Sequence, residues 1–152
     1  MNIRNATADD AAAIAEFVST LATKHIGPSL GDGGLGVLLE SMNEAETRQR
    51  MIDGWPHTCA FRGDRIVGLV VVKPPTHLYH LFVTTELQGT GIGRKLLGVA
   101  DQWSDATSGE SIRTVNSSLN TVAIYNRFGF EADGPMVDTN GVRYQPMVRK
   151  PG

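Results

Sequence analysis

The sequence has a single cysteine and no long apolar run. Cys59 has no partner for an internal disulfide, which excludes the disulfide-stabilised scaffolds of small secreted proteins. Its neighbours Thr58, Ala60 and Phe61 are typical of a strand, so we expect a buried structural thiol rather than a reactive one. The apolar stretches fall short of the roughly 20 residues that a membrane-spanning helix needs. No membrane partner is expected.

Neither sign of charge dominates the sequence. It has 14 lysine and arginine residues and 16 aspartate and glutamate residues, which gives a formal charge of −2 and a pI near 6.1. Because binding to nucleic acid requires a clustered excess of basic residues, this balance argues against a nucleic-acid partner. Any anionic ligand must be held by local groups. The amino terminus turns polar at Asn2 and lacks the apolar segment of a secretory signal, which favours a cytoplasmic location.

The rest of the composition is that of an ordinary globular protein. With 152 residues, of which 41% are hydrophobic and 20% are charged, the chain has the commonest length of one domain. Folding can bury about 70% of the surface that such a chain exposes when unfolded. We therefore expect a single domain over residues 1–152, without repeats or an internal linker.

Hydrophobic periodicity predicts helices in the first third of the chain and strands after it. A helix is predicted over 8–23, where Thr7 and Asp10 have the spacing of a capping box. A mobile glycine-rich loop over 27–34 follows, and then amphipathic segments that begin near Leu38 and at Glu44. The strand period then predicts a hairpin of 58–62 and 66–73 and a further strand over 77–83.

Strands and helices alternate in the second half of the chain. A helix with Ile92 on its apolar face is predicted to end at Gly109, and a strand over 111–117 follows. Asn120 is expected to cap a short helix that Gly129 ends. A terminal strand pair turns at 139–141 and returns over 142–149. This order of elements predicts a mixed α/β fold.

A glycine-rich run, Gln88-Gly89-Thr90-Gly91-Ile92-Gly93-Arg94-Lys95, joins a predicted strand to a predicted helix. Unpaired backbone N–H groups and the positive end of the helix converge there, which predicts an anion site. A Walker A loop would end in Gly-Lys-Ser/Thr, but Arg94 precedes Lys95 and Leu96 follows it. A dinucleotide fingerprint that starts at Gly89 would need a third glycine where Arg94 stands. The run therefore matches neither the Walker A motif nor the dinucleotide-binding fingerprint.

The same run resembles the Gln/Arg-x-x-Gly-x-Gly/Ala signature of the GNAT superfamily of N-acetyltransferases, at Gln88, Gly91 and Gly93. Leu81-Phe82-Val83 stands where that family has its fourth strand, and 125–130 matches its Tyr-x-x-x-Gly-Phe signature. The chain is most similar to a branch that shares His77, Asn116-Ser117-Ser118 and Pro146-Met147. The resemblance covers residues 3–150 and is best over 67–130.

The resemblance implies a fold and a cosubstrate. The fold is a mostly antiparallel central sheet, flanked by helices, whose fourth and fifth strands splay apart. Acetyl-CoA lies between those strands as though it were an added strand, without a metal. The implied cosubstrate-binding residues are Leu81, Phe82, Val83, Gln88, Gly89, Thr90, Gly91, Ile92, Gly93, Arg94, Ser118 and Asn120. The family usually has an asparagine where this chain has Ser118, so the contact from that position stays open.

The resemblance also implies catalytic residues. Tyr125 falls at the position of the general acid, where a phenol protonates the departing thiolate of coenzyme A. The substrate ammonium must lose a proton before it attacks. Some relatives use a glutamate where this chain has Arg113, and others use one at the place of His77. We take His77 as the candidate base and leave His80 and an ordered water as alternatives.

These observations predict an acetyl-CoA-dependent N-acetyltransferase that acts on a primary amine, most simply a small molecule, by direct attack in a ternary complex. Two alternatives stay open. One is a CoA-binding regulatory or sensor module that has lost acyl transfer, and the other is a protein or peptide N-acetyltransferase. The segments 25–46 and 135–144 are expected to determine which acceptor is used. The identity of the acceptor and the existence of a homodimer are not predicted.

Overall fold

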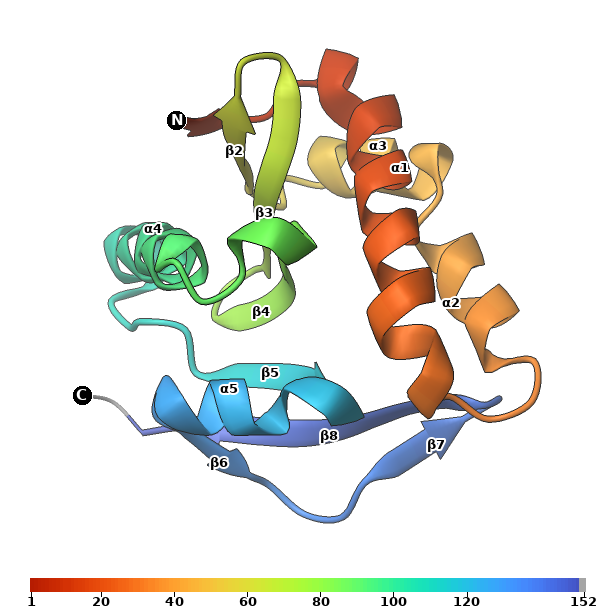
Figure 1. Ribbon diagram of the computed structural model, residues 1–152. Coiled ribbons are helices and arrows are strands. Elements are labelled where there is room, and N and C mark those ends of the chain that lie inside the picture. The colour runs from red at the N-terminus through yellow and green to blue at the C-terminus, as the bar shows by residue number, and fades with distance from the viewer. Residues whose placement is uncertain (151–152) are drawn as a thin grey trace.

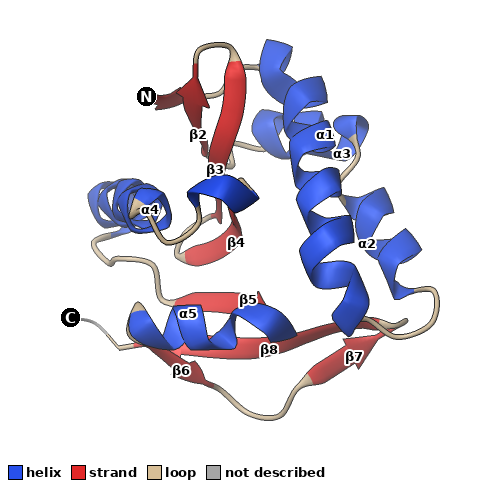
Figure 2. Ribbon diagram, in the orientation of Figure 1, coloured by secondary structure: helices blue, strands red, loops and turns tan. Residues whose placement is uncertain are grey.

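The computed structural model describes residues 1–150 and contains an eight-stranded sheet. The strand order is β1-β2-β3-β4-β5-β8-β6, and β7 pairs with β8 (Figures 1 and 2). The strands are β1 (Asn2–Asn5), β2 (His57–Arg62), β3 (Arg65–Lys73), β4 (His77–Val83), β5 (Thr114–Ser118), β6 (Phe130–Ala132), β7 (Val137–Thr139) and β8 (Val142–Arg149). All pairs are antiparallel except β4 with β5. The expected mixed, mostly antiparallel fold is confirmed.

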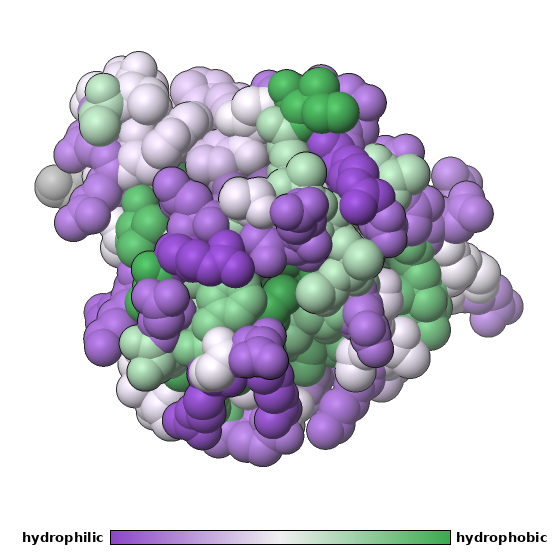
Figure 3. Space-filling view, turned by 90° about the horizontal axis from the view of Figure 1, so that it is seen from above, coloured by the Kyte–Doolittle hydropathy of each residue, from purple (hydrophilic) through white to green (hydrophobic). Residues whose placement is uncertain are grey.

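Five α-helices cover the sheet within these residues: α1 (Ala11–Leu21), α2 (Gly34–Ser41), α3 (Glu44–Ile52), α4 (Ile92–Ser108) and α5 (Val122–Arg127). α4 and α5 pack on one face, and α1 and α3 pack on the other with the end of α2 (Figure 1). Within residues 1–150, no helix combines the length and apolar character that a membrane crossing requires. Figure 3 shows polar and apolar residues intermixed on one side of the surface.

β3 lies at the centre of the two cores because both of its faces are apolar. Val70 and Val72 pack on the α4 side, and Leu69 and Val71 pack on the α1 side. A continuous apolar run is the pattern of a strand covered on both faces. Cys59 of the neighbouring β2 is completely buried, as predicted, and burial raises the pKa of its thiol to about 12. The thiol is therefore protonated and unreactive at neutral pH.

β4 and β5 form a short parallel contact and then separate. They pair only at His77 with Thr114 and at Leu78 with Val115. Beyond these pairs, residues 79–83 of β4 and 116–118 of β5 have no partner in each other, and we call these residues the splayed segment. β5 pairs instead with β8 along its whole length, from Thr114 to Ser118 (Figure 1). The expected divergence of the fourth and fifth strands is confirmed.

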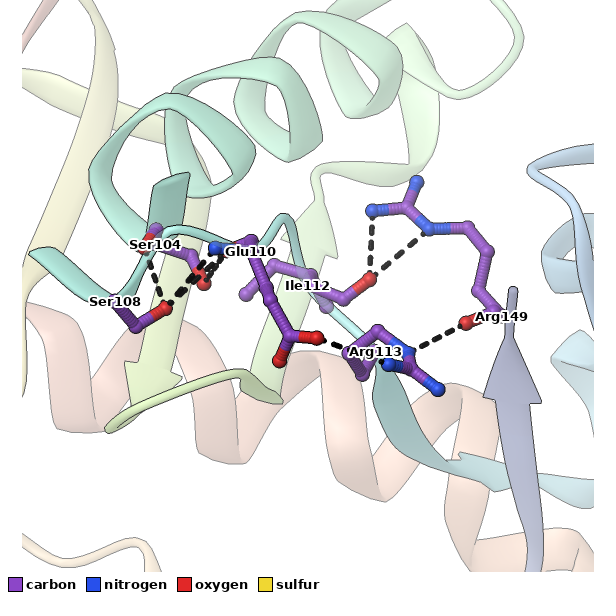
Figure 4. A network of polar contacts seen from close by, with 6 residues as sticks. All are labelled: Ser104, Ser108, Glu110, Ile112, Arg113 and Arg149. Carbon is purple, nitrogen blue, oxygen red and sulfur yellow. Dashed lines mark hydrogen bonds and ion pairs between the residues drawn. The ribbon is translucent and has the colours of Figure 1, made fainter. Parts of the chain in front are cut away.

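A polar network ties the two halves of the sheet together beside the β4–β5 contact (Figure 4). The Arg149 guanidinium donates twice to the Ile112 carbonyl, at 3.1 and 2.9 Å, and pairs with the Asp101 carboxylate of α4. Asp101 also accepts the Ile112 N–H at 3.0 Å, and Arg113 Nε donates to the Arg149 carbonyl at 3.0 Å. The fully buried Ser104 hydroxyl donates to the carbonyls of Pro75 and Glu110. Several of these carbonyls would otherwise be unpaired.

Three predicted boundaries need correction. The helix predicted over 8–23 begins as a 3-10 turn at 8–10 and ends at residue 21 in a π-helical turn at 22–26. The loop predicted over 27–34 contains a 3-10 turn at 27–29 and the start of α2. Asn120 does not cap α5, because it lies inside a 3-10 turn over 119–121 and Thr121 precedes the helix. Serine, threonine and asparagine all suit a cap, so sequence alone did not choose among them.

The segment before α2 is held against the β7–β8 turn. Gly31 N–H donates to the Gly141 carbonyl at 2.9 Å, and a Cβ on Gly34 would lie 2.1 Å from that same oxygen. Asn140 and Gly141 both have positive φ, at 54° and 86°, as a tight two-residue hairpin turn requires. The two regions that the sequence suggested for acceptor choice are therefore in direct contact.

We predict that Gly34→Ala destabilises the protein by about 1–3 kcal/mol, because the new methyl group overlaps the Gly141 backbone. Gly36→Ala is the matched control on the same helix, since no atom lies within 4 Å of its added Cβ. That control should gain about 0.5–1 kcal/mol from helix propensity. Urea unfolding measures both effects, and equal stability of the two variants would contradict the close contact.

Candidate active site

A β-bulge at Tyr79 determines which side chains of β4 share a face. Leu78 pairs with Val72 and His80 pairs with Val71, so Tyr79 is the extra residue. Residues three apart on a regular strand face opposite sides, and one extra residue reverses that relation. His77 and His80 therefore lie on the same face of the sheet, the one covered by α1 and α3. Without the bulge, the alternation of a regular strand would have placed the two histidines on opposite faces.

In residues 79–83 of β4, the backbone is unpaired on the side that faces β5. Thr84 N–H donates to the Val67 carbonyl at 2.9 Å, so by alternation Phe82 also faces β3, whereas Leu81 and Val83 face away from it. The Gln88 side-chain amide donates to the Val83 carbonyl at 3.1 Å. Both backbone groups of Leu81 and the N–H of Val83 remain available. The Phe82 side chain packs on the α1 side instead.

The glycine run forms an open turn at the start of α4. Gly89 and Gly91 have φ of 80° and 93°, which side-chain-bearing residues rarely adopt, and no atom lies within 4 Å of a Cβ added to either. Lys95 N–H closes the first helical hydrogen bond, to Gly91 at 3.1 Å. The N–H groups of Ile92, Gly93 and Arg94 therefore point out of the helix end, where they favour an anion.

The side chains of this run have separate roles. Ile92 is buried in the core under α4, so only its backbone is available at the turn. Thr90 Oγ1 donates to the Leu87 carbonyl at 2.5 Å. The Arg94 guanidinium lies 5.3 Å from the centre of the Phe128 ring, which connects α4 to the residue that follows α5. Arg94 lies in the first turn of α4 and forms no ion pair within residues 1–150.

Tyr125 of α5 is buried on the α4 side of the sheet. Its ring packs edge-on against Phe128 and Phe130, with centroid distances of 6.3 and 5.7 Å. Burial raises the pKa of its phenol above the ordinary value of 10. The hydroxyl makes no hydrogen bond within residues 1–150, yet no fully buried side-chain polar atom there lacks a partner. The hydroxyl is therefore not sealed from solvent, and it is protonated at neutral pH.

His77 lies where β4 and β5 last touch. Its Nδ1 is 2.8 Å from the Thr114 hydroxyl of β5, which fixes the orientation of the ring. Burial, with a smaller contribution from the charge of Lys73, lowers the pKa of His77 below 6.5. The imidazole is therefore neutral at pH 7, as a proton acceptor must be.

A cluster of aromatic and basic side chains surrounds His80 beneath α3. The His80 ring lies 4.4 Å from the Tyr79 ring and 5.4 Å from the Phe82 ring. Burial, with the nearby charge of Arg50, lowers the pKa of His80 to about 3, so it stays neutral. His57 Nδ1 lies 2.7 Å from the Trp55 carbonyl. This pattern is that of a packed aromatic cluster around one buried cation.

Two predicted cosubstrate residues lie at the end of β5 and in the turn that follows it. The Ser118 hydroxyl is 2.9 Å from the Thr121 hydroxyl, and Asn120 is exposed in the turn. Arg113 takes the place of the glutamate that the resemblance gives to some relatives. Its side chain donates to the Arg149 carbonyl in the polar network described above. The sequence analysis missed Thr114, the Gln88–Val83 contact and Arg50. It also missed His25, whose Nε2 lies 2.9 Å from the Thr85 hydroxyl just after β4.

Comparison with protein families agrees with this geometry. The family model of the GNAT acetyltransferase domain matches residues 26–151. The chain belongs to the GNAT acetyltransferase family. This GNAT domain is therefore an acyl-CoA-dependent N-acyltransferase. A search of curated proteins found no match.

Solved structures share the fold of this GNAT domain over nearly the whole chain. A GCN5-related N-acetyltransferase from Rhodopseudomonas palustris is 21% identical, with a TM-score of 0.77, and the match covers 97% of this chain and 94% of that one. The PaiA N-acetyltransferase of Thermoplasma acidophilum, solved with coenzyme A, is 16% identical with a TM-score of 0.73 and 98% of both chains covered. YjaB from Escherichia coli is 16% identical, with a TM-score of 0.71, and 99% of this chain and 98% of that one covered.

We predict that Gly91→Asp abolishes acetyl-CoA binding, because a carboxylate at this turn would repel the pyrophosphate and occupy its approach. Gly91→Ala isolates the strain of a side chain at φ 93°, which costs about 1–2 kcal/mol of folding stability. Gly98→Asp adds the same charge in open space further along α4. Calorimetric titration should show binding in the control and none in Gly91→Asp. Unchanged affinity in a folded Gly91→Asp protein would refute the assignment.

Proposed function

We propose that this domain transfers an acetyl group from acetyl-CoA to the primary amine of a small molecule, by direct attack within a ternary complex. Three features on the α4 side of the sheet support the proposal. These are the unpaired backbone of Leu81 and Val83, the open N-terminus of α4, and the free hydroxyl of Tyr125. Acetyl-CoA supplies the activated acyl group, and the residues bind it, orient it and move protons.

The splayed segment suits pantetheine because its backbone groups are unpaired. Leu81 N–H and C=O and Val83 N–H can pair with the amides of an extended ligand, as they would with another strand. The Val83 carbonyl already accepts a hydrogen bond from the Gln88 side chain, so it is not among the groups that would pair with the ligand. The N–H groups of the α4 N-terminus, with Gly89 and Gly91, suit the pyrophosphate. Orientation of the thioester by rigid backbone is the main catalytic contribution expected of this arrangement.

His77 is the proposed base. When Nδ1–H donates to the Thr114 hydroxyl, Nε2 carries the lone pair that accepts the amine proton, directly or through a water. The lowered pKa keeps this nitrogen unprotonated at neutral pH. His80 has no comparable anchor on β5 and packs between Tyr79 and Phe82.

Tyr125 is the proposed acid. After the amine attacks the thioester carbon and the C–S bond breaks, the departing sulfur carries negative charge. As the C–S bond breaks, the neutral phenol donates a hydrogen bond and then its proton to the sulfur. Because the pKa of the phenol is higher than that of a thiol, near 8.5, the transfer is completed when the proton released by the amine, carried by solvent, returns to the phenolate. The hydroxyl of Tyr125 makes no other hydrogen bond that would have to break first.

We predict that Tyr125→Phe lowers kcat by about 10²- to 10⁴-fold. The Kd for acetyl-CoA should change much less, because Phe keeps the ring contacts with Phe128 and Phe130. Single-turnover kinetics measures the chemical step, and calorimetry measures the affinity. Wild-type kcat in a folded mutant, when chemistry limits the rate, would show that Tyr125 only packs.

We predict that His77→Gln lowers kcat/KM most at neutral pH and recovers toward pH 9 as the amine loses its proton unaided. Because the pKa of His77 is lowered, the acid limb of the wild-type profile attributable to it should lie below about 6.5. His80→Gln is the comparison variant on the same face, and it should keep the wild-type profile shape. If His80→Gln instead loses activity most at neutral pH while His77→Gln keeps the wild-type profile, His80 is the base and the assignment to His77 is wrong.

A further inference from the structure

Arg50 is a buried cation on the face of α3 that points at the sheet. It is 9% exposed, and its only hydrogen bond within residues 1–150 runs from Nη2 to the Ser41 carbonyl at 2.6 Å. Its guanidinium carbon lies 4.9 Å from the centre of the Tyr79 ring. An arginine in this position is held by the end of α2 and by an aromatic face, with most of its donors unused.

No anion balances this charge in the described chain. Arg50 takes part in no ion pair within residues 1–150, whereas Arg48 on the same helix is paired with Glu44. A buried charge without a counter-charge is costly, and evolution usually removes it or pairs it. Nε and Nη1 have no hydrogen-bond partner but are not sealed from solvent, since no fully buried side-chain polar atom lacks a partner. These donors therefore keep some contact with solvent.

The guanidinium lies over a side chain of the strand that carries the proposed base. Tyr79, which it covers, is the bulge residue of β4, and it lies two positions from His77 on the strand that would orient the acetyl group. Two positions along a strand span about 7 Å. Tyr79 therefore connects the guanidinium to the part of β4 that carries His77.

The surroundings of Arg50 favour an anion. Burial, with a contribution from the charge of Arg50, lowers the pKa values of His57 and His80, so both imidazoles are neutral and neither competes with Arg50 for an anion. Lys73 adds a second cation on the far side of Trp55, with Nζ 5.9 Å from the ring centre. A single planar guanidinium with free parallel donors matches a carboxylate, which it can bind bidentately.

From this geometry we infer that Arg50 binds a carboxylate of the acceptor, so that the substrate is a small amino acid or a similar amine with a carboxylate a few bonds away. This inference rests on the proposed function and names its substrate class. Bound carboxylate would neutralise Arg50 and hold the amine over Tyr79, next to His77. The choice of acceptor would then be made on α3 and β4, in addition to the segments 25–46 and 135–144.

The test compares amino acids with their primary amides, which keep the amine and side chain but lack the negative charge. With acetyl-CoA, the wild-type enzyme should have a kcat/KM about 10- to 100-fold higher for at least one amino acid than for its amide, in line with a charge-assisted hydrogen bond. Arg50→Gln should remove most of that preference by raising KM for the acid. Arg50→Lys should restore part of it. Thermal unfolding establishes that each variant is folded.

The outcomes separate the inference from the proposed function. If amides and simple alkylamines are acetylated as well as the acids, and Arg50→Gln leaves the ratio unchanged, the inference fails while the proposed function stands. Preference for an aminoalkylphosphonate over the matched carboxylate would also overturn it. If no amine of any kind is acetylated, the proposed function itself fails. Should both Arg50 variants misfold, the wild-type ratio of acid to amide still decides, because a ratio near one refutes the inference.

Discussion

The parallel contact between β4 and β5 is the constraint on which the rest of the structure depends. It consists of two residue pairs, His77 with Thr114 and Leu78 with Val115. The bulge at Tyr79 begins at the next residue, and a bulge bends its strand and increases its twist. β5 follows β8 instead, through five consecutive pairs. Two firmly paired halves of the sheet therefore meet at one short contact, and their strands diverge from a defined residue onward.

This short contact needs reinforcement, because two residue pairs are few for holding half a sheet. The network around Arg149, Asp101 and Ile112 supplies it by joining β8, α4 and the segment before β5. Ser104 adds the turn before β4 through the Pro75 carbonyl. Since the polar groups of this network are mostly shielded and mutually satisfied, it can hold a fixed separation of the strands. The separation in turn leaves Leu81 and Val83 with unpaired backbone groups.

The two faces of the separated strands have different chemistry. On the α4 side, the helix N-terminus and the Tyr125 hydroxyl present hydrogen-bond donors, which suit phosphates and a departing thiolate. On the α1 and α3 side, neutral histidines lie beside one buried guanidinium. An acyl donor that enters from one face and an acceptor that enters from the other would meet at His77, where the strands begin to part.

Sequence by itself determined the elements whose signals are local. The glycines at 89 and 91 allow positive φ wherever they stand, the apolar run of β3 requires two covered faces, and Asn140-Gly141 specifies its turn. The motif spacing then gave the family, because it depends on short stretches of chain. Tertiary structure alone decided which residues share a face and which charges lack partners. One extra residue at Tyr79 brought His77 and His80 to the same side, and a bulge leaves no firm mark in the residue pattern. Arg50 belongs to a mostly polar helix in the sequence, and only the packing of α3 on β4, which also buries Thr47 one turn earlier, left its charge buried without a counter-charge.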